Sequence, residues 1–237
     1  MTFAPGRGWS YSNPGYVALG MVLEQITRQP LAELVQQRIA RPLGLKDTAL
    51  PRQNAPHPVT ARLAHGYEPD AAHLAPLLPE GTPAGFGFVG PVRGERIDVT
   101  AINPNWYGSA GSIVSSPADW ARIDQALMRG QLVPPAQLEQ MMRVVPEDVD
   151  DPDFGPDRRY GLGLEEVRTP CGTVWGHDGA LPGYNSDNYT DRAGTRTASV
   201  ISTTLFGLKT DSTAGTARDA VVTAAVCAML GRPVPAS

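Results

Sequence analysis

Residues 9–16 read Trp-Ser-Tyr-Ser-Asn-Pro-Gly-Tyr, and the rest of the chain is best interpreted outward from this stretch. A polar residue followed by proline is a typical helix start, because the side chain caps free N–H groups and proline fits the first turn. Asn13 is therefore the predicted cap of a helix. Four apolar residues follow at three- and four-residue spacing and predict one apolar stripe on that helix: Tyr16, Leu19, Leu23 and Ile26.

Further elements follow from the same kinds of signal. Helices are predicted where a cap or a proline precedes periodic apolar residues, at 30–40, 117–129, 135–144 and 212–230. Strands are predicted where short runs lie between turn signals, at 60–67, 95–99, 160–169, 172–177, 186–190 and 193–204. Ser116 is the predicted cap of the helix at 117–129. The expected core face of that helix is Trp120, Ile123 and Leu127, and that of the last helix is Val221, Ala225, Ala228 and Met229.

Helices followed by antiparallel strands and a final helix predict an α+β fold. We expect one domain over 1–237, with a mainly helical and loop region at 1–145. Antiparallel strands and the C-terminal helix are expected at 160–231. Residues 191–194, Asp-Arg-Ala-Gly, predict a hairpin turn.

A second informative segment, Trp-Gly-His-Asp-Gly-Ala at 175–180, lies at the end of a predicted strand. Taken singly, the residues of both segments have ordinary structural explanations. Tyr11 fits a partly buried ring, Asn13 a helix cap, His177 a polar strand end and Gly179 a turn. A Tyr-x-Asn triplet is common by chance, so only the combination with the flanking motifs carries information.

The ordered set of motifs resembles one family. The set is Phe3-x-Pro5-Gly6, Tyr11-Ser-Asn-Pro-Gly-Tyr16, Pro42-Leu43-Gly44-Leu45-x-x-Thr48, Ala110-Gly111-Ser112-x-x-Ser115-x-x-x-Asp119 and Gly176-His177-x-Gly179. It resembles the serine β-lactamase and penicillin-binding protein superfamily, in the branch of class C β-lactamases, Streptomyces-type D-alanyl-D-alanine carboxypeptidases and related esterases. The resemblance implies a β-lactamase/transpeptidase-like fold, with an antiparallel sheet and flanking helices, truncated at its N-terminus.

The resemblance also implies roles for individual residues. Tyr11 and His177 are the expected catalytic residues: Tyr11 transfers the proton of a serine, and His177 supports its phenol by charge or hydrogen bond. A tyrosine with an ordinary pKa near 10 acts as a base only where nearby cations favour its ionised form. The expected substrate-binding residues are Asn13 for the substrate amide, Trp106 lining the groove, Gly179 admitting a substrate backbone and Ala180, whose N–H serves the oxyanion hole.

The family's Ser-x-x-Lys motif does not occur in these 237 residues, since neither Lys46 nor Lys209 has a serine three positions before it. Three explanations are open: a fragment of a longer protein, one piece of a two-chain enzyme, or a short protein without catalysis. We favour the first and expect the chain as given to be inactive. A complementing N-terminal segment is a possible partner, and without it we expect apolar faces to meet water.

The resemblance implies a serine hydrolase that works through an acyl-enzyme, with D-alanyl peptides, β-lactams or small esters as substrates. D-Alanyl-D-alanine carboxypeptidase-like activity is the first expectation, from His177-x-Gly179 and a cysteine pair. β-Lactamase or small-ester esterase activity is the first alternative. The second is a non-catalytic peptide-binding or regulatory protein. Asp178 stands where many relatives have Thr or Ser, and its charge disfavours substrates that end in a carboxylate.

Cys171 and Cys227 resemble the disulfide of the Streptomyces-type carboxypeptidases, and a bridge implies that the parent protein is extracellular or in the cell envelope. The first residues lack the charged and apolar regions of a signal peptide. A net charge of −4 gives no electrostatic footprint for nucleic acid, and no apolar run is long enough to span a membrane. Two cysteines and four scattered histidines indicate no metal site, and no cofactor is implied.

Overall fold

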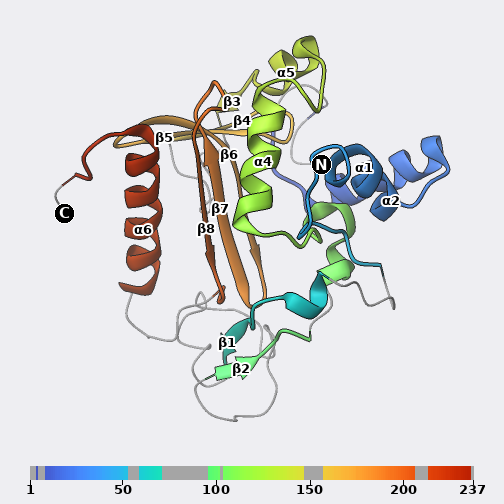
Figure 1. Ribbon diagram of the computed structural model, residues 1–237, viewed down its shortest axis with the longest axis horizontal. Coiled ribbons are helices and arrows are strands. Elements are labelled where there is room, and N and C mark those ends of the chain that lie inside the picture. Colours follow the sequence, from blue (N-terminus) through green and yellow to red (C-terminus); the bar gives the residue numbers. More distant parts are fainter. Residues whose placement is uncertain are drawn as a thin grey trace.

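A six-stranded antiparallel sheet forms the centre of the molecule (Figure 1). The computed structural model describes residues 4, 9–52, 59–70, 96–101, 104–146, 157–205 and 213–235, and only the backbone at 104–106, 146 and 213–216. Each strand pairs with the next along the chain, which confirms the predicted antiparallel sheet. The strands are β3 (Val145–Pro146), β4 (Arg158–Tyr160), β5 (Glu165–Thr169), β6 (Gly172–Leu181), β7 (Tyr184–Thr190) and β8 (Thr197–Ser202).

Helices α4 and α6 cover opposite faces of this sheet. Neighbouring residues of a strand point to opposite faces, and Val174 and Trp175 of β6 belong to different core clusters. Val174 packs with Val226 of α6, whereas Trp175 packs with Met128 of α4. The α-helices are α1 (Asn13–Thr27), α2 (Leu31–Val35), α4 (Pro117–Met128), α5 (Pro135–Met141) and α6 (Thr213–Leu230), and the shorter helices are η1 (Gln36–Ala40), η2 (Thr60–Arg62) and η4 (Pro104–Ala110).

A small second sheet pairs β1 (Tyr67–Pro69) with β2 (Arg96–Asp98). Glu68 of β1 is fully buried, and its Oε1 accepts hydrogen bonds from the N–H groups of Gly183 (2.6 Å) and Leu205 (2.7 Å). A buried carboxylate with charge-assisted bonds to two backbone donors is strongly held. Glu68 therefore fixes the small sheet to the β6–β7 turn.

The strand predicted at 60–67 was wrong, since residues 60–62 form η2 and β1 begins only at Tyr67. Other predicted strands have different bounds in the structure. The expected strand at 160–169 divides into β4 and β5, because Gly163 adopts a φ of 73° that an extended strand does not allow. The strand expected at 172–177 continues to Leu181. The hairpin turn at 191–194 forms as predicted, with Gly194 at a φ of 64° and its N–H bonded to the carbonyl of Asp191.

The motifs at 42–48 and 110–119 meet in a buried polar cluster. The Oδ2 of Asp119 accepts hydrogen bonds from the N–H of Asp47 (2.7 Å) and the hydroxyl of Thr48 (3.1 Å). Thr48 also bonds to Ser115 (2.8 Å), and Ser116 caps α4 as predicted. The predicted core face of α4 is confirmed at Leu127, which packs against the core cluster that includes Met128 and Trp175, but Trp120 and Ile123 are only partly buried. The buried residues of α4 are Asp119, Asp124, Ala126 and Met128.

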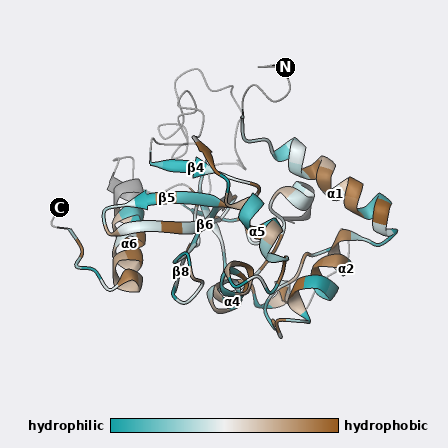
Figure 2. Ribbon diagram, turned by 90° about the horizontal axis from the view of Figure 1, so that it is seen from above, coloured by the Kyte–Doolittle hydropathy of each residue, from teal (hydrophilic) through white to brown (hydrophobic). Residues whose placement is uncertain are grey.

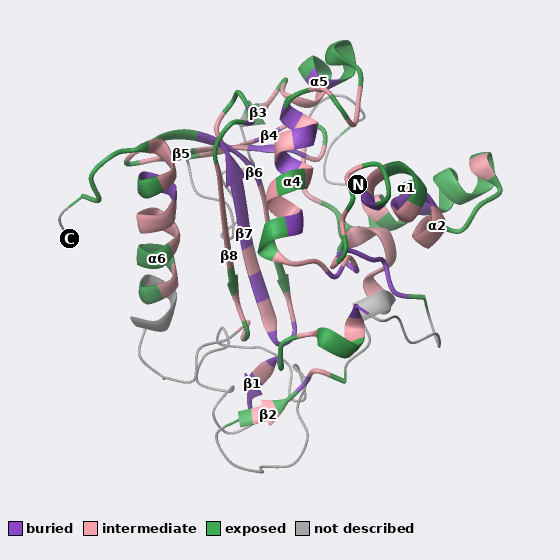
Figure 3. Cartoon of the chain, in the orientation of Figure 1, coloured by how far each residue is buried: buried purple, intermediate pink, exposed green. Residues whose placement is uncertain are grey.

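Helix α1 differs most from the prediction. Its cap is Ser12 rather than Asn13, since the Ser12 hydroxyl accepts the N–H of Gly15 at 3.1 Å. Gly20, its one buried residue, leaves room for Ser109 of η4, whose hydroxyl donates to the carbonyl of Tyr16 at 2.7 Å. The expected core stripe is largely exposed, as the hydrophobic ribbon in Figure 2 and the exposed ribbon in Figure 3 show; Leu19 is 58%, Leu23 47% and Ile26 75% exposed.

The final helix buries only part of the predicted face. Met229 packs against the core cluster of Val174, Tyr189 and Val226 as expected. Val226 and Cys227 are buried, whereas Val221 (56%) and Ala228 are exposed. Cys171, just before β6, forms a disulfide with Cys227, with Cα atoms 5.2 Å apart. This bridge links α6 to the strand that carries His177. No helix among the described residues has the length and hydropathy needed to cross a membrane.

Candidate active site

Tyr11 and His177, the two expected catalytic residues, lie close together. Tyr11 comes from the segment before α1 and His177 from the middle of β6, yet their ring centroids are 6.1 Å apart. Both side chains are partly buried. The fold thus brings the Tyr-x-Asn and His-x-Gly motifs to one place, although 166 positions separate these residues in the sequence.

Further aromatic rings surround this pair. The ring of Tyr160, at the end of β4, lies 5.8 Å from Tyr11 and 5.6 Å from His177 by centroids, edge-on to each. Trp9 packs on Tyr160 at 4.8 Å, and Tyr16 lies 5.8 Å from Tyr11. Such edge and tilted arrangements are favourable ring contacts. They hold the segment before α1 against the end of β4 and the middle of β6.

A hydrogen-bond chain runs through the imidazole of His177. The hydroxyls of Tyr16 and Tyr160 are 2.6 Å apart, and the Tyr160 hydroxyl lies 3.1 Å from Nε2 of His177. On the other side of the ring, Nδ1 lies 2.6 Å from the carbonyl oxygen of Asp178. The ring is therefore held at both nitrogens.

Three charged side chains lie beside the imidazole. Arg158 of β4 donates to Oε2 of Glu165 (3.0 Å) and to Oδ2 of Asp178 (2.7 Å). Oε1 of Glu165 is 3.6 Å from Nε2 of His177. Burial and the charge of Asp178 raise the pKa of Glu165, against the opposing effect of Arg158.

The environment of Tyr11 favours its neutral phenol. Burial raises the pKa of Tyr11, and the charges of Tyr16, Glu165 and Asp178 raise it further. A tyrosine base needs the opposite influence from nearby cations. The described surroundings therefore do not by themselves activate Tyr11 as a proton acceptor.

The expected substrate-binding residues divide into two groups. Gly179 and Ala180 lie on β6 beyond the last residue paired with β5, and among the described strands they pair with β7 alone. Alternate residues of such a strand direct N–H and C=O groups to the open edge. One of the two adjacent residues therefore faces the edge that no described strand pairs with. The backbone and oxyanion contacts expected of Gly179 and Ala180 stay predictions, and the side chain of Trp106 lies outside the described residues.

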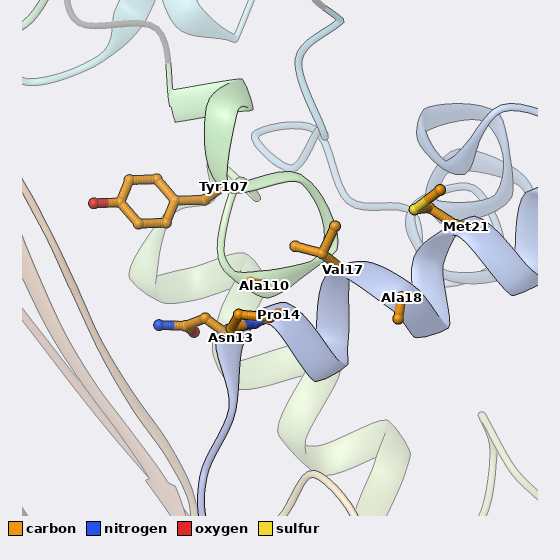
Figure 4. Close-up of a pocket in the computed structure, with 7 residues that line it drawn as sticks. All are labelled: Asn13, Pro14, Val17, Ala18, Met21, Tyr107 and Ala110. Carbon is orange, nitrogen blue, oxygen red and sulfur yellow. The ribbon is translucent and has the colours of Figure 1, made fainter. Parts of the chain in front are cut away.

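Asn13 lies at the edge of an apolar hollow of about 410 Å³ between α1 and η4. Figure 4 shows that the side chains of Asn13 and Tyr107 extend in the same direction, toward the strands. The remaining lining residues are Pro14, Val17, Ala18, Met21 and Ala110. The hollow therefore continues the exposed apolar side of α1 up to the candidate site.

One group of possible metal ligands occurs in the described part of the chain: Glu165, His177 and Asp178, whose ligand atoms lie within 4.8 Å of one another. Arg158 already pairs with both carboxylates, and both nitrogens of His177 have other partners. A cation there would lie beside a guanidinium, which is unfavourable. These residues do not fit a metal site.

Sequence reasoning missed Tyr160, Glu165 and Arg158. Their only early signal was an unusual density of charge around the start of the strand predicted at 160–169, since Arg158, Arg159, Glu165 and Glu166 fall within nine positions. Their closeness to His177 depends on strand register, in which Tyr160 pairs with Glu165 and Glu165 with Gly176.

The chain resembles proteins of known family over most of its length. The Beta-lactamase family profile matches residues 1–223. Penicillin-binding protein 4* of Bacillus subtilis is 26% identical over 78% of this chain and 37% of its own length. A putative D-alanyl-D-alanine carboxypeptidase of Salmonella paratyphi B is 28% identical over 62% of this chain and 34% of its own. A D-stereospecific amidohydrolase from Streptomyces sp. is structurally similar, with a TM-score of 0.69 and 30% identity, over 95% of this chain and 57% of that one.

The antiparallel sheet between helices, with a Tyr-x-Asn segment against a His-x-Gly strand, places the molecule in the serine hydrolase superfamily that includes penicillin-binding proteins. The chain belongs to the Beta-lactamase family. It spans 37% and 34% of the two curated relatives and 57% of the amidohydrolase chain.

Proposed function

We propose that this chain carries the tyrosine and histidine part of the active site of a serine hydrolase, which cleaves amide bonds of D-amino acid substrates through an acyl-enzyme. The observation that supports this most is the position of Tyr11 against His177, 6.1 Å apart by ring centroids, beside the open edge of β6. Tyr11 would transfer the serine proton, and the β6 edge would stabilise the oxyanion.

The charges at the site favour an uncharged leaving group within this substrate class. In a carboxypeptidase the leaving group ends in a carboxylate, which needs a free cation. Arg158 is already paired with Glu165 and Asp178 at 3.0 and 2.7 Å. The added charge of a substrate carboxylate would be repelled by Asp178. We therefore place D-aminoacyl amides and neutral peptides ahead of D-alanyl-D-alanine, the first expectation from sequence.

We propose that a complementing segment supplies the nucleophile and its lysine. No Ser-x-x-Lys occurs in these residues. The pKa of Tyr11 is raised in this chain, and a nearby lysine ammonium would lower it. The exposed apolar side of α1 and the hollow beside Asn13 are the surfaces on which such a segment would pack. The disulfide further supports an exported parent protein.

Covalent labelling tests whether the nucleophile lies in this chain or in a complementing segment. The chain alone, incubated with a fluorescent penicillin or an activated ester, is expected to take no label. A protein that includes a complementing Ser-x-x-Lys segment is expected to be labelled and to hydrolyse D-alanine amide. If the chain alone is labelled, the nucleophile lies within it, and Ser12→Ala is the first variant to examine.

Substitution of Tyr11 in the protein that includes a complementing segment tests whether Tyr11 transfers the proton. Tyr11→Phe is expected to lower kcat roughly 10²- to 10⁴-fold, the range for loss of a general acid–base group. The matched control is Tyr184→Phe, because the Tyr184 hydroxyl donates to the carbonyl of Ala64. Equal activity of both variants would remove Tyr11 from the mechanism.

The second candidate is a non-catalytic peptide-binding or regulatory protein on the same fold. The neutral environment of Tyr11 in this chain favours it. It predicts that D-alanyl peptides bind to the chain without turnover, even when a complementing segment is present. β-Lactamase and esterase activity are the remaining alternatives. Hydrolysis of the fluorescent penicillin would indicate the first, and hydrolysis of the activated ester the second.

A further inference from the structure

The hydroxyl of Tyr160 joins Tyr16 to His177 in the hydrogen-bond chain of the candidate site. Tyr160 is 3% exposed, and its hydroxyl lies between the Tyr16 hydroxyl at 2.6 Å and Nε2 of His177 at 3.1 Å. Its position at the end of β4 is fixed by pairing with Glu165 of β5.

The direction of each hydrogen bond follows from what the groups can donate. The carbonyl oxygen of Asp178 only accepts, so Nδ1 of His177 must carry a proton to bond with it at 2.6 Å. In the neutral ring Nε2 is then the acceptor, and the donor facing it is the Tyr160 hydroxyl. The oxygen of Tyr160 in turn accepts from Tyr16.

Glu165 competes for the same nitrogen. Its Oε1 lies 3.6 Å from Nε2 of His177 and is buried without a hydrogen-bond partner among the described residues. A carboxylate oxygen favours a proton on Nε2, whereas a donating hydroxyl favours a lone pair there. Without Tyr160 the imidazole would face an acceptor at each nitrogen.

We propose that Tyr160 is a positioning residue that holds neutral His177 with its proton on Nδ1 and its lone pair on Nε2, against the pull of Glu165. The ionisable and charged side chains around the ring are Tyr11 from the segment before α1, Tyr160 and Arg158 from β4, Glu165 from β5 and Asp178 from β6.

The arrangement fixes how His177 acts on Tyr11. A neutral ring with an unprotonated Nε2 supports the phenol by position and by accepting hydrogen bonds, not by positive charge. That consequence rests on the proposed function. The tautomer of His177 does not depend on the proposed function, because it is measured on this chain without turnover. A wrong tautomer and a wrong function would therefore be detected separately.

Nitrogen NMR of protein labelled with ¹⁵N-histidine measures the tautomer directly. At pH 9.5, where an ordinary imidazole is neutral and which lies above the raised pKa of Glu165, His177 is expected to show a pyridine-type Nε2 and a pyrrole-type Nδ1, assigned by loss of the signals in His177→Gln. A pyrrole-type Nε2 in the unaltered chain would overturn the proposal without any variant.

Tyr160→Phe keeps the ring on Trp9 and removes only the hydroxyl. The pyridine-type signal of Nε2 is expected to be lost, because that nitrogen becomes protonated toward Glu165. Tyr16→Phe leaves the donor in place and is expected to retain the signal, as is the distant control Tyr184→Phe. A purely structural role for Tyr160 predicts an unchanged Nε2 signal in folded Tyr160→Phe, and that result would refute the proposal.

Discussion

Two helices of similar length use their apolar residues in opposite ways. In α6, Val226 is 1% exposed and packs against Val174 and Tyr189 of the sheet. In α1, by contrast, Gly20 is the one buried residue. Six large apolar side chains of α1 are 37–75% exposed: Val17, Leu19, Met21, Val22, Leu23 and Ile26.

The contrast teaches what an apolar stripe does and does not predict. Periodic apolar residues predict a helix that needs a partner surface, but not whether that surface lies in the same chain. The sheet supplies the partner for α6. An exposed patch of this kind marks an interaction site, which fits a complementing segment on α1. Stability measurements can therefore show how completely the sheet region is packed and whether the apolar side of α1 is exposed to solvent.

The largest effect is expected from the disulfide, which ties α6 to the strand before His177. The double variant Cys171→Ser, Cys227→Ser opens a loop with a sequence separation of 56. The free energy of unfolding should fall by about 4 kcal/mol, by the loop-closure entropy of the unfolded chain. Urea denaturation measures it, and reduction of the unaltered chain is the control. Two free thiols in the oxidised, denatured protein would contradict the bridge.

The buried polar cluster at the start of α4 should be nearly as important. Asp119→Ala leaves the N–H of Asp47 and the hydroxyl of Thr48 without their acceptor in a buried place. We expect a loss of roughly 3–4 kcal/mol. Asp219→Ala on the exposed surface of α6 is the matched control and should stay within about 0.5 kcal/mol. Equal unfolding midpoints for the two variants would show that the cluster contributes nothing.

Local chemistry explains which parts of the fold the sequence predicted. The Ser116 cap, the turn at 191–194 and the bounds of α6 depend on residues close together in the chain, and they are observed. The strand predicted over 160–169 was divided by Gly163, whose left-handed conformation no apolar pattern shows. The cap of α1 shifted by one residue because Ser12 and Asn13 are both good caps.

The candidate site was predictable only in part, for a different reason. Resemblance pointed to Tyr11 and His177, and the fold brings their rings together. Tyr160, Glu165 and Arg158 lie beside His177 through the register of three strands. Register is a long-range property, since it depends on which face is buried and on turn geometry. Nothing local in the sequence distinguishes Glu165 from an exposed strand glutamate.

A buried carboxyl on α4 should make the stability of the sheet region depend on pH. Burial raises the pKa of Asp124 to about 7, and in the part of the chain that the structure describes its Oδ2 is buried without a hydrogen-bond partner. In the unfolded chain the carboxyl ionises near pH 4, so the folded state binds more protons between pH 4 and 7. Stability from this group is therefore lost as the pH rises through that window.

Asp124→Asn reproduces the neutral acid in shape and removes this dependence. The variant should match the unaltered chain near pH 4 and exceed its stability by on the order of 3 kcal/mol at pH 8. Urea midpoints at pH 4, 5.5 and 8 provide the test. A constant difference across these three values would show that Asp124 does not titrate in this window.

The smallest effect gives the sharpest comparison between the two helices. Val226→Ala removes two methyl groups from a fully packed place against the sheet and should cost about 2 kcal/mol, through lost burial and the cavity left behind. Val22→Ala makes the same chemical change on α1, where the side chain is 50% exposed. Its cost should lie within about 0.5 kcal/mol of zero, because alanine also has the higher helix propensity.

If both substitutions cost about 2 kcal/mol in the chain alone, α1 is already covered, for example by a second copy, and the apolar side of the helix is not open to a complementing segment. If the cost of Val22→Ala rises only when such a segment is added, while that of Val226→Ala stays constant, the added stability comes from the exposed side of α1.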